Sequence, residues 1–91
     1  MVKIRFSSAL SNVVQTRETI LHIGDATIKT VLDKLVQQFG QDFEKRIFDK
    51  GEVRRFINIY VNGEDIRHLK GLDSIVNDTG EISILPAVSG G

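Results

Sequence analysis

Apolar and polar residues alternate along four stretches of the chain, which is the pattern of a β-strand with one buried face. The clearest stretch is residues 2–7, and the others are residues 17–23, 56–61 and 81–85. We expect the inward-facing side chains to be Val2, Ile4 and Phe6 in the first strand, and Thr19, Leu21 and Ile23 as one arrangement of the second. In the third and fourth strands they should be Ile57, Ile59 and Val61, and Ile82 and Ile84.

Residues 28–39 carry apolar side chains at helical rather than strand spacing. Thr27 or Asp25 can cap the start of this helix, and Gly40 stands where a residue of positive φ often ends one. The spacing predicts an amphipathic helix that packs its apolar stripe against the sheet, and the stripe consists of Ile28, Val31, Leu32, Leu35, Val36 and Phe39.

The remaining segments have weaker patterns. Residues 8–16 show little periodicity and are expected to form a loop. Residues 40–55 are rich in charge, and Phe43, Ile47 and Phe48 would form one face of a short second helix ended by Gly51.

The pair Asn62-Gly63 predicts a hairpin turn, so residues 64–68 should return as a short antiparallel strand. Residues 69–78 should form a loop with a single helical turn at 74–77. The order of elements indicates an α+β fold, with one main helix on one face of a mixed sheet.

Composition limits the classes of function. Ninety-one residues make one domain, and twelve acidic side chains balance twelve basic ones, which disfavours partners such as nucleic acid or a membrane surface. No apolar run is as long as a membrane span, and the N-terminus alternates like a strand rather than a signal peptide. We therefore expect a cytoplasmic protein.

The chain contains no cysteine, which excludes disulfides, iron–sulfur clusters and a thiol nucleophile. His22 and His68 lie in different segments without an obvious catalytic partner, and we expect both to be ordinary strand residues. There is also no phosphate-binding glycine loop and no metal-ligand cluster in the sequence. We expect no metal and no cofactor bound by this chain. If the chain carries sulfur or an acyl group, the C-terminal carboxylate is the only place for it.

The C-terminal stretch is therefore the main candidate for chemistry. From Ile82 onward it has no charged side chain, and Pro86 marks the point where sheet pairing should stop. We expect a domain over residues 1–85 followed by a flexible tail, 86–91, which can reach about 20 Å when extended. Without Cβ atoms, Gly90 and Gly91 could pass a narrow channel and leave the terminal carboxylate unhindered.

The run from Ile82 to Gly91, following the turn Gly80-Glu81, closely resembles the C-terminus of ubiquitin-like sulfur carriers. It is similar to the small subunit of molybdopterin synthase and to the small archaeal modifier proteins. The resemblance extends over nearly the full chain, including the run from Tyr60 to Ile66 and the triplet Gly71-Leu72-Asp73. It implies a β-grasp fold, in which the last strand is inserted beside the first and the main helix crosses the sheet.

The resemblance also implies a function and partners. A ubiquitin-activating-type enzyme would use ATP to adenylate the carboxylate of Gly91, which then becomes a thiocarboxylate that donates sulfur to the molybdopterin precursor or another acceptor. The large subunit of molybdopterin synthase is a candidate partner. Attack by a lysine amine would instead make the chain a protein modifier linked through Gly91. A third hypothesis is a non-covalent interaction domain. None of these roles makes the chain an enzyme by itself, since catalysis would belong to its partners.

A docking surface can also be predicted. If Ile57, Ile59 and Val61 face the helix, then Phe56 and Tyr60 point outward, as does Leu85. Such an exposed apolar patch often marks an interface. The alternative is that the short second helix or the 69–78 loop covers it. We expect a partner to contact this patch and the adjoining Pro86, Ala87, Val88 and Ser89. Arg54 and Arg55 nearby would either meet an acidic partner or stay solvated.

Overall fold

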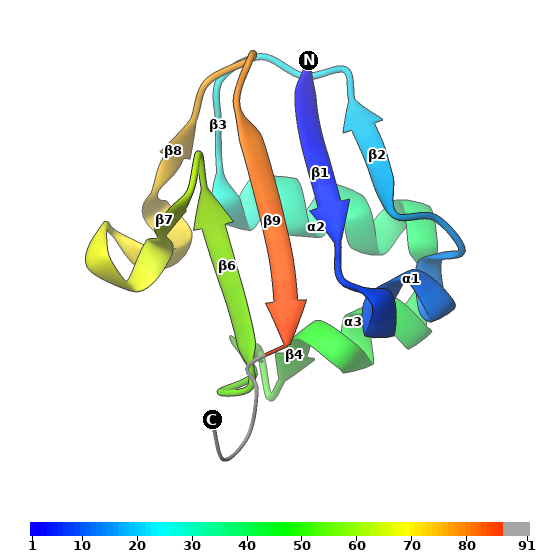
Figure 1. The fold of residues 1–91 in the computed structure, drawn as a ribbon. Helices are drawn as coiled ribbons and strands as arrows, with labels where there is room; N and C mark the ends of the chain where they lie inside the picture. Colours follow the sequence, from blue (N-terminus) through cyan, green and yellow to red (C-terminus); the bar gives the residue numbers. More distant parts are fainter. Residues whose placement is uncertain (87–91) are drawn as a thin grey trace.

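The computed structural model describes residues 1–86, and residues 87–91 lie outside this description. Its main sheet has five strands in the order β2-β1-β9-β6-β7 (Figure 1). These strands are β2 (Glu18–Leu21), β1 (Val2–Phe6), β9 (Glu81–Pro86), β6 (Ile57–Val61) and β7 (Glu64–Asp65). The last strand, β9, therefore occupies the centre of the sheet. It runs parallel to β1 and antiparallel to β6.

Helix α2 (Ile28–Phe39) crosses one face of this sheet, as the sequence pattern predicts (Figure 1). Its cap is Thr27, whose Oγ1 accepts a hydrogen bond from the N–H of Thr30 at 3.2 Å. Asp25 has another role, because its Oδ1 accepts from the N–H of Asp78 at 3.0 Å. Gly40 follows the helix with a φ of +87°, a value that favours glycine. The strand order and the crossing helix together form the β-grasp arrangement.

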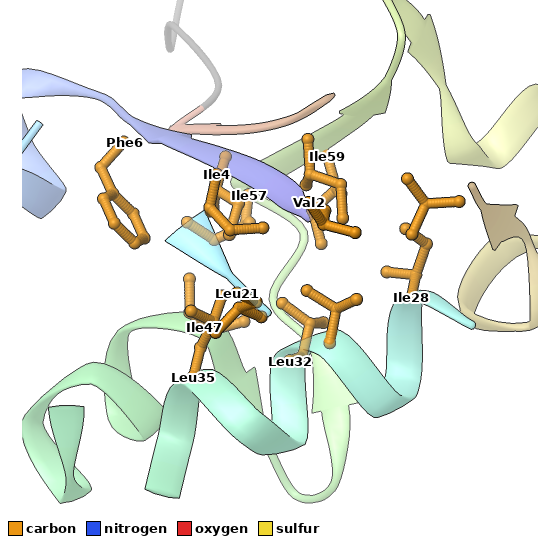
Figure 2. Close-up of a cluster of buried hydrophobic side chains, with 14 of the residues drawn as sticks. Val2, Ile4, Phe6, Leu21, Ile28, Leu32, Leu35, Ile47, Ile57 and Ile59 are labelled. Atoms are coloured by element: carbon orange, nitrogen blue, oxygen red, sulfur yellow. The ribbon is translucent and has the colours of Figure 1, made fainter. Parts of the chain in front are cut away.

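The core lies between the sheet and α2. Figure 2 shows Val2 and Ile4 of β1 and Ile57 and Ile59 of β6 above Leu32 and Leu35 of the helix. All the predicted inward residues of β1, β6 and β9 are buried, whereas in β2 only Leu21 is buried and Thr19 is partly exposed. Edge-to-face contact of Phe6 with Phe39 and Phe43, at centroid distances of 5.7 and 6.0 Å, closes one end of the core.

The expectation of a loop over residues 8–16 is wrong. Helix α1 (Ser8–Val14) occupies most of it, and Ser7 caps this helix by accepting a hydrogen bond from the N–H of Leu10 at 3.3 Å. Leu10 and Val14, one turn apart, are both buried. Gln15 ends the helix in a left-handed conformation, with a φ of 62°. Two apolar residues one turn apart give little periodicity in the sequence. They are nevertheless enough to hold a two-turn helix that packs on the core of the domain.

Helix α3 (Gln41–Ile47) confirms the short second helix and buries Phe43 and Ile47. Phe48 does not belong to it. Instead Phe48 begins β4 (Phe48–Asp49), which forms a hairpin with β5 (Glu52–Val53). The hairpin turn consists of Lys50 and Gly51, both with positive φ, which matches the twist of a two-residue hairpin loop.

The region after β6 also departs from expectation. The hairpin turn at Asn62 and Gly63 is present, but β7 is only two residues long. Asp65 ends it by accepting a hydrogen bond from the N–H of Arg67 at 2.8 Å, which starts the 3₁₀ helix η1 (Ile66–His68).

The predicted helical turn at residues 74–77 is wrong. The 3₁₀ helix η2 (Gly71–Asp73) comes first, and β8 (Ile75–Val76) then pairs antiparallel with β3 (Ala26–Thr27). This pairing lies at the start of α2 and joins the loop to the helix layer (Figure 1). Within residues 1–86, no helix has both the length and the apolar character that crossing a membrane requires.

Candidate functional site

The candidate site is the carboxyl end of β9, and its two neighbouring strands end at different points. On the side of β1, pairing stops at Ile84, whose carbonyl accepts a hydrogen bond from the N–H of Ser7 at 3.1 Å. On the side of β6, pairing continues to Leu85 and Pro86, which lie opposite Asn58 and Ile57. The last two residues of β9 are thus paired on one side only, and the observed strand is one residue longer than the predicted one.

Pro86 lies where its missing N–H costs no sheet hydrogen bond. Opposite it, Ile57 directs both backbone groups away from β9: its N–H donates to the carbonyl of Arg54 at 3.0 Å and its carbonyl accepts from Arg67 at 2.9 Å. The proline therefore ends the pairing without leaving a donor on β6 unsatisfied. Both Leu85 and Pro86 are exposed.

The beginning of β9 is anchored on both sides, and this fixes the direction in which the strand leaves the domain. The carbonyl of Gly80 accepts from the N–H of Lys3 at 3.1 Å. Glu81 exchanges two hydrogen bonds with Asn62: its carbonyl accepts from the backbone N–H at 2.8 Å, and its own N–H donates to Oδ1 at 2.9 Å. The strand thus runs through the middle of the sheet to the end of the sheet that lies beside α3 and β4 (Figure 1).

Five predicted site residues lie outside the described residues: Ala87, Val88, Ser89, Gly90 and Gly91. The same holds for the prediction that the tail is flexible and for the proposed reaction at the terminal carboxylate. The structure therefore defines only where the C-terminal segment begins, which is at Pro86.

The predicted docking patch is largely open. Phe56 is 65% exposed and Leu85 38% exposed, while Tyr60 is half-buried. The register of β6 and β9 puts Leu85 opposite Asn58 and Tyr60 opposite Ser83, on the sheet face away from α2. Neither α3 nor the segment 69–78 hides Phe56 or Leu85. Binding of a partner to this patch stays a prediction.

Charged side chains on the same sheet face pair with one another. Arg5 Nε lies 2.9 Å from Glu81 Oε1 and 3.8 Å from Glu18 Oε2, and Lys3 Nζ is also 3.8 Å from Glu18. These pairs are exposed and contribute little to stability. They do leave this part of the face with balanced charge beside the apolar patch.

Other candidates for chemistry are sparse in the described residues. His22 and His68 are both exposed, the first after β2 and the second in η1 rather than in strands. Nowhere in residues 1–86 do three or more histidine, aspartate or glutamate side chains gather as metal ligands would.

One supporting residue is not evident from the sequence. The guanidinium of Arg67 donates from Nη2 to the carbonyl of Ile57 at 2.9 Å and to Asn58 Oδ1 at 2.6 Å. Arg67 thereby braces the first residues of β6, which face the last residues of β9. No sequence signal points to this contact, because it depends on the 3₁₀ turn that follows the unexpectedly short β7.

Comparison with known proteins gives consistent results. Residues 4–91 match the ThiS family. The sulfur carrier protein CysO of Mycobacterium tuberculosis is 51% identical over 68 residues, which cover 71% of this chain and 72% of that protein.

Two solved structures share the fold over nearly the whole chain. The crystal structure of the BexX/CysO complex of Amycolatopsis orientalis has a TM-score of 0.86 at 28% identity and full coverage of both chains. The solution structure of small archaeal modifier protein 1 of Methanosarcina acetivorans has a TM-score of 0.85 at 35% identity, covering 99% of this chain and 95% of that one. These findings confirm the β-grasp fold and the expected resemblance, and they show a carrier rather than an enzyme. The chain belongs to the ThiS family of ubiquitin-like sulfur carriers.

Proposed function

We propose that this protein carries sulfur as a thiocarboxylate on Gly91, after a ubiquitin-activating-type enzyme has adenylated the terminal carboxylate. The observation that carries the proposal is that the ThiS family match runs through Gly91 and thus includes the terminal Gly-Gly. The absence of cysteine supports it, because no side chain of this protein can hold sulfur as a thiolate or persulfide.

The chemistry divides between the carrier and its partner. A carboxylate oxygen of Gly91 attacks the α-phosphorus of ATP and pyrophosphate leaves, which makes a mixed anhydride with AMP. Hydrosulfide supplied by the partner system then attacks the acyl carbon: the C–S bond forms, the C–O bond to AMP breaks, and loss of the sulfur-bound proton leaves the thiocarboxylate. ATP and its metal ion would be bound by the activating enzyme. The carrier has to present an unhindered carboxylate, for which two residues without Cβ atoms are suited.

The activating enzyme has to hold the domain while the tail enters its active site. In the proposal it contacts the exposed patch of Phe56, Tyr60 and Leu85, beside the point where β9 ends. The segment Pro86, Ala87, Val88 and Ser89 spans the distance between this surface and the reacting carboxylate, with Gly90 in the narrowest part of the channel. The solved BexX/CysO complex supports stable association of a carrier of this fold with a partner protein.

A second function has a specific observation in its favour. The 35% identity to small archaeal modifier protein 1 supports conjugation of Gly91 to lysine amines of target proteins. The first step is the same, and only the nucleophile that attacks the adenylate differs. A role with the large subunit of molybdopterin synthase, with the molybdopterin precursor as sulfur acceptor, stays a prediction from the C-terminal resemblance.

Intact mass spectrometry of the protein purified from its own cells tests the proposal. Sulfur transfer predicts a fraction in which one terminal oxygen is replaced by sulfur, and reduction should not remove it. Conjugation instead predicts adducts on target lysines that contain the C-terminal residues of this chain. A non-covalent interaction domain predicts neither product, and its function should survive deletion of Gly90 and Gly91. Absence of both products would contradict the proposal.

A further inference from the structure

A groove of about 550 Å³ opens beside β6, on the side of β7 rather than that of β9. The β4–β5 hairpin forms one wall, and η1 and η2 form the other. Its apolar lining consists of Val53, Ile57, Ile59, Ile66 and Leu72. The groove shares no residue with the docking patch of Phe56, Tyr60 and Leu85, so it is a separate surface.

The charged residues that line the groove are mostly basic. Three arginines, Arg54, Arg55 and Arg67, line it together with a single acidic residue, Glu52. Within residues 1–86, Arg54 and Arg55 have no carboxylate within 4.0 Å, and Arg67 reaches Asp65 only at that limit. On the open sheet face, by contrast, Arg5 is paired with two glutamates. Among residues 1–86, the groove thus combines an apolar floor with three arginines, two of which have no carboxylate partner there.

Two of the three guanidinium groups are held in place. Arg54 donates from Nε to the carbonyl of Lys45 at 2.7 Å, and Arg67 donates from Nη2 to the carbonyl of Ile57 at 2.9 Å. Each keeps other N–H groups for a ligand. Side chains that are already ordered lose less conformational entropy when they bind an anion, and the planar guanidinium suits a carboxylate.

The mode of binding can also be argued. The edge of β6 at Ile57 cannot accept an added strand, because Arg54 and Arg67 already satisfy its backbone N–H and carbonyl. At this position a ligand binds through its side chains, with aliphatic groups on the apolar floor and carboxylates at the rim. We propose that this groove docks an acidic segment of a partner protein in which leucine or isoleucine side chains are flanked by aspartate or glutamate.

This inference does not depend on sulfur transfer, because it concerns a surface that the adenylation reaction does not use. The test is a titration of the labelled full-length chain, followed by amide NMR, with a capped nine-residue peptide in which two leucines alternate with aspartates. The expected shifts are at residues 52–57 and 66–72. The amides of Arg5, Ser83 and Leu85 on the open sheet face should not move. Shifts confined to that face, or no binding at millimolar peptide, would overturn the proposal.

Matched variants sharpen the test. Arg55→Glu should weaken binding of the peptide at least tenfold. Arg55→Lys should retain most of the affinity, because it keeps the positive charge and because the side chain of Arg55 makes no hydrogen bond in the described structure that lysine would lose. The control is Arg17→Glu, an exposed charge reversal next to β2 at the opposite edge of the sheet, which should leave affinity unchanged. Equal weakening by both reversals would overturn the site and point to a general effect of net charge.

Three other results would assign the groove to a different occupant and so overturn the proposal. Inorganic phosphate or citrate alone could shift the same amides, which indicates a small-anion site. Shifts that grow with protein concentration in the absence of peptide indicate a second copy of this chain. Shifts at the groove on removal of residues 87–91 indicate the chain's own C-terminal segment. A peptide with lysines in place of aspartates is the negative control, and equal binding of it would contradict the role of the arginines.

Discussion

The first four and the last two residues of β9 differ in how the fold holds them. Between Glu81 and Ile84 the strand is paired on both sides, and Ile82 and Ile84 are completely buried. Leu85 and Pro86 are paired on one side and exposed. One continuous strand thus contains both the centre of the core and the start of the segment that carries the proposed chemistry. Because of this difference, substitutions in the buried part of β9 should change stability, and substitutions beyond Ile84 should change the proposed reactivity.

The largest expected effect comes from the buried half. Ile84→Ala should lower the free energy of unfolding by about 2–5 kcal/mol, because it removes buried methyl groups and leaves a cavity. Its exposed neighbour is the matched control, and Leu85→Ala should cost about 0.5 kcal/mol or less. Urea unfolding of both variants measures the difference. Similar losses for the two would contradict the division of the strand.

A smaller effect is expected just before the strand. A Cβ on Gly80 would lie 2.5 Å from Val76 Cγ2 and 3.1 Å from the carbonyl oxygen of Asn77. Gly80→Ala should therefore destabilise the fold by about 1–3 kcal/mol through overpacking. Gly24→Ala is the control, because a Cβ there has no neighbour within 4 Å. Thermal unfolding of the two variants should separate them, and an unchanged melting temperature for Gly80→Ala would show that Val76 moves aside freely.

The docking patch should affect binding more than stability. Replacing Phe56 and Tyr60 together by alanine should weaken binding to the activating enzyme about tenfold, or roughly 1.4 kcal/mol, while the fold stays intact. Ile20→Ala provides a control, since Ile20 is also exposed but lies on β2 at the far edge of the sheet. Titration calorimetry with the enzyme gives both affinities. Unchanged affinity for the double variant would exclude this patch as the docking surface.

The smallest effect on stability is expected at Gly90. Gly90→Ala should change the free energy of unfolding by less than about 0.5 kcal/mol, because the buried core of the described residues runs from Val2 to Ile84. It should nevertheless impair activation, since a Cβ would crowd a channel that the tail has to thread. Comparing the unfolding curve with the rate of adenylation tests both halves of this expectation. A fully active variant would remove the steric argument for glycine at this position.

The longer elements could be predicted from the sequence because their periodicity is a direct result of burial. The stripe from Ile28 to Phe39 and the alternation from Ile57 to Val61 each cover enough residues to distinguish helix from strand. The C-terminal run likewise indicates the family, because its strand, proline, short spacer and terminal Gly-Gly are all local features of the sequence. For the site, the exposure of Leu85 followed correctly from the alternation of its neighbours. Phe56 is also exposed, but it lies in the turn before β6 and not in the strand that the sequence predicts for it.

The missed elements are those whose stability comes from distant partners. Strand β8 contains two residues and pairs with Ala26 and Thr27, about fifty positions earlier. No local sequence pattern therefore predicts this strand. Helix α1 has two buried residues, Leu10 and Val14, too few to establish a period. The arginine groove combines residues from the β4–β5 hairpin and both 3₁₀ helices, and the sequence shows these only as scattered charges. The secondary structure of such segments is determined by tertiary packing rather than by local sequence.

The central claim is that the carboxylate of Gly91 is the reacting group, and ATP–pyrophosphate exchange with the cognate activating enzyme tests it most directly. The comparison includes the natural chain, a Gly91 deletion and a variant with one residue added after Gly91. We predict exchange for the natural chain, strongly reduced exchange for the deletion, and none for the extension until the added residue is cleaved, because the reactive carboxylate is then an amide. Equal exchange from all three chains would contradict the account.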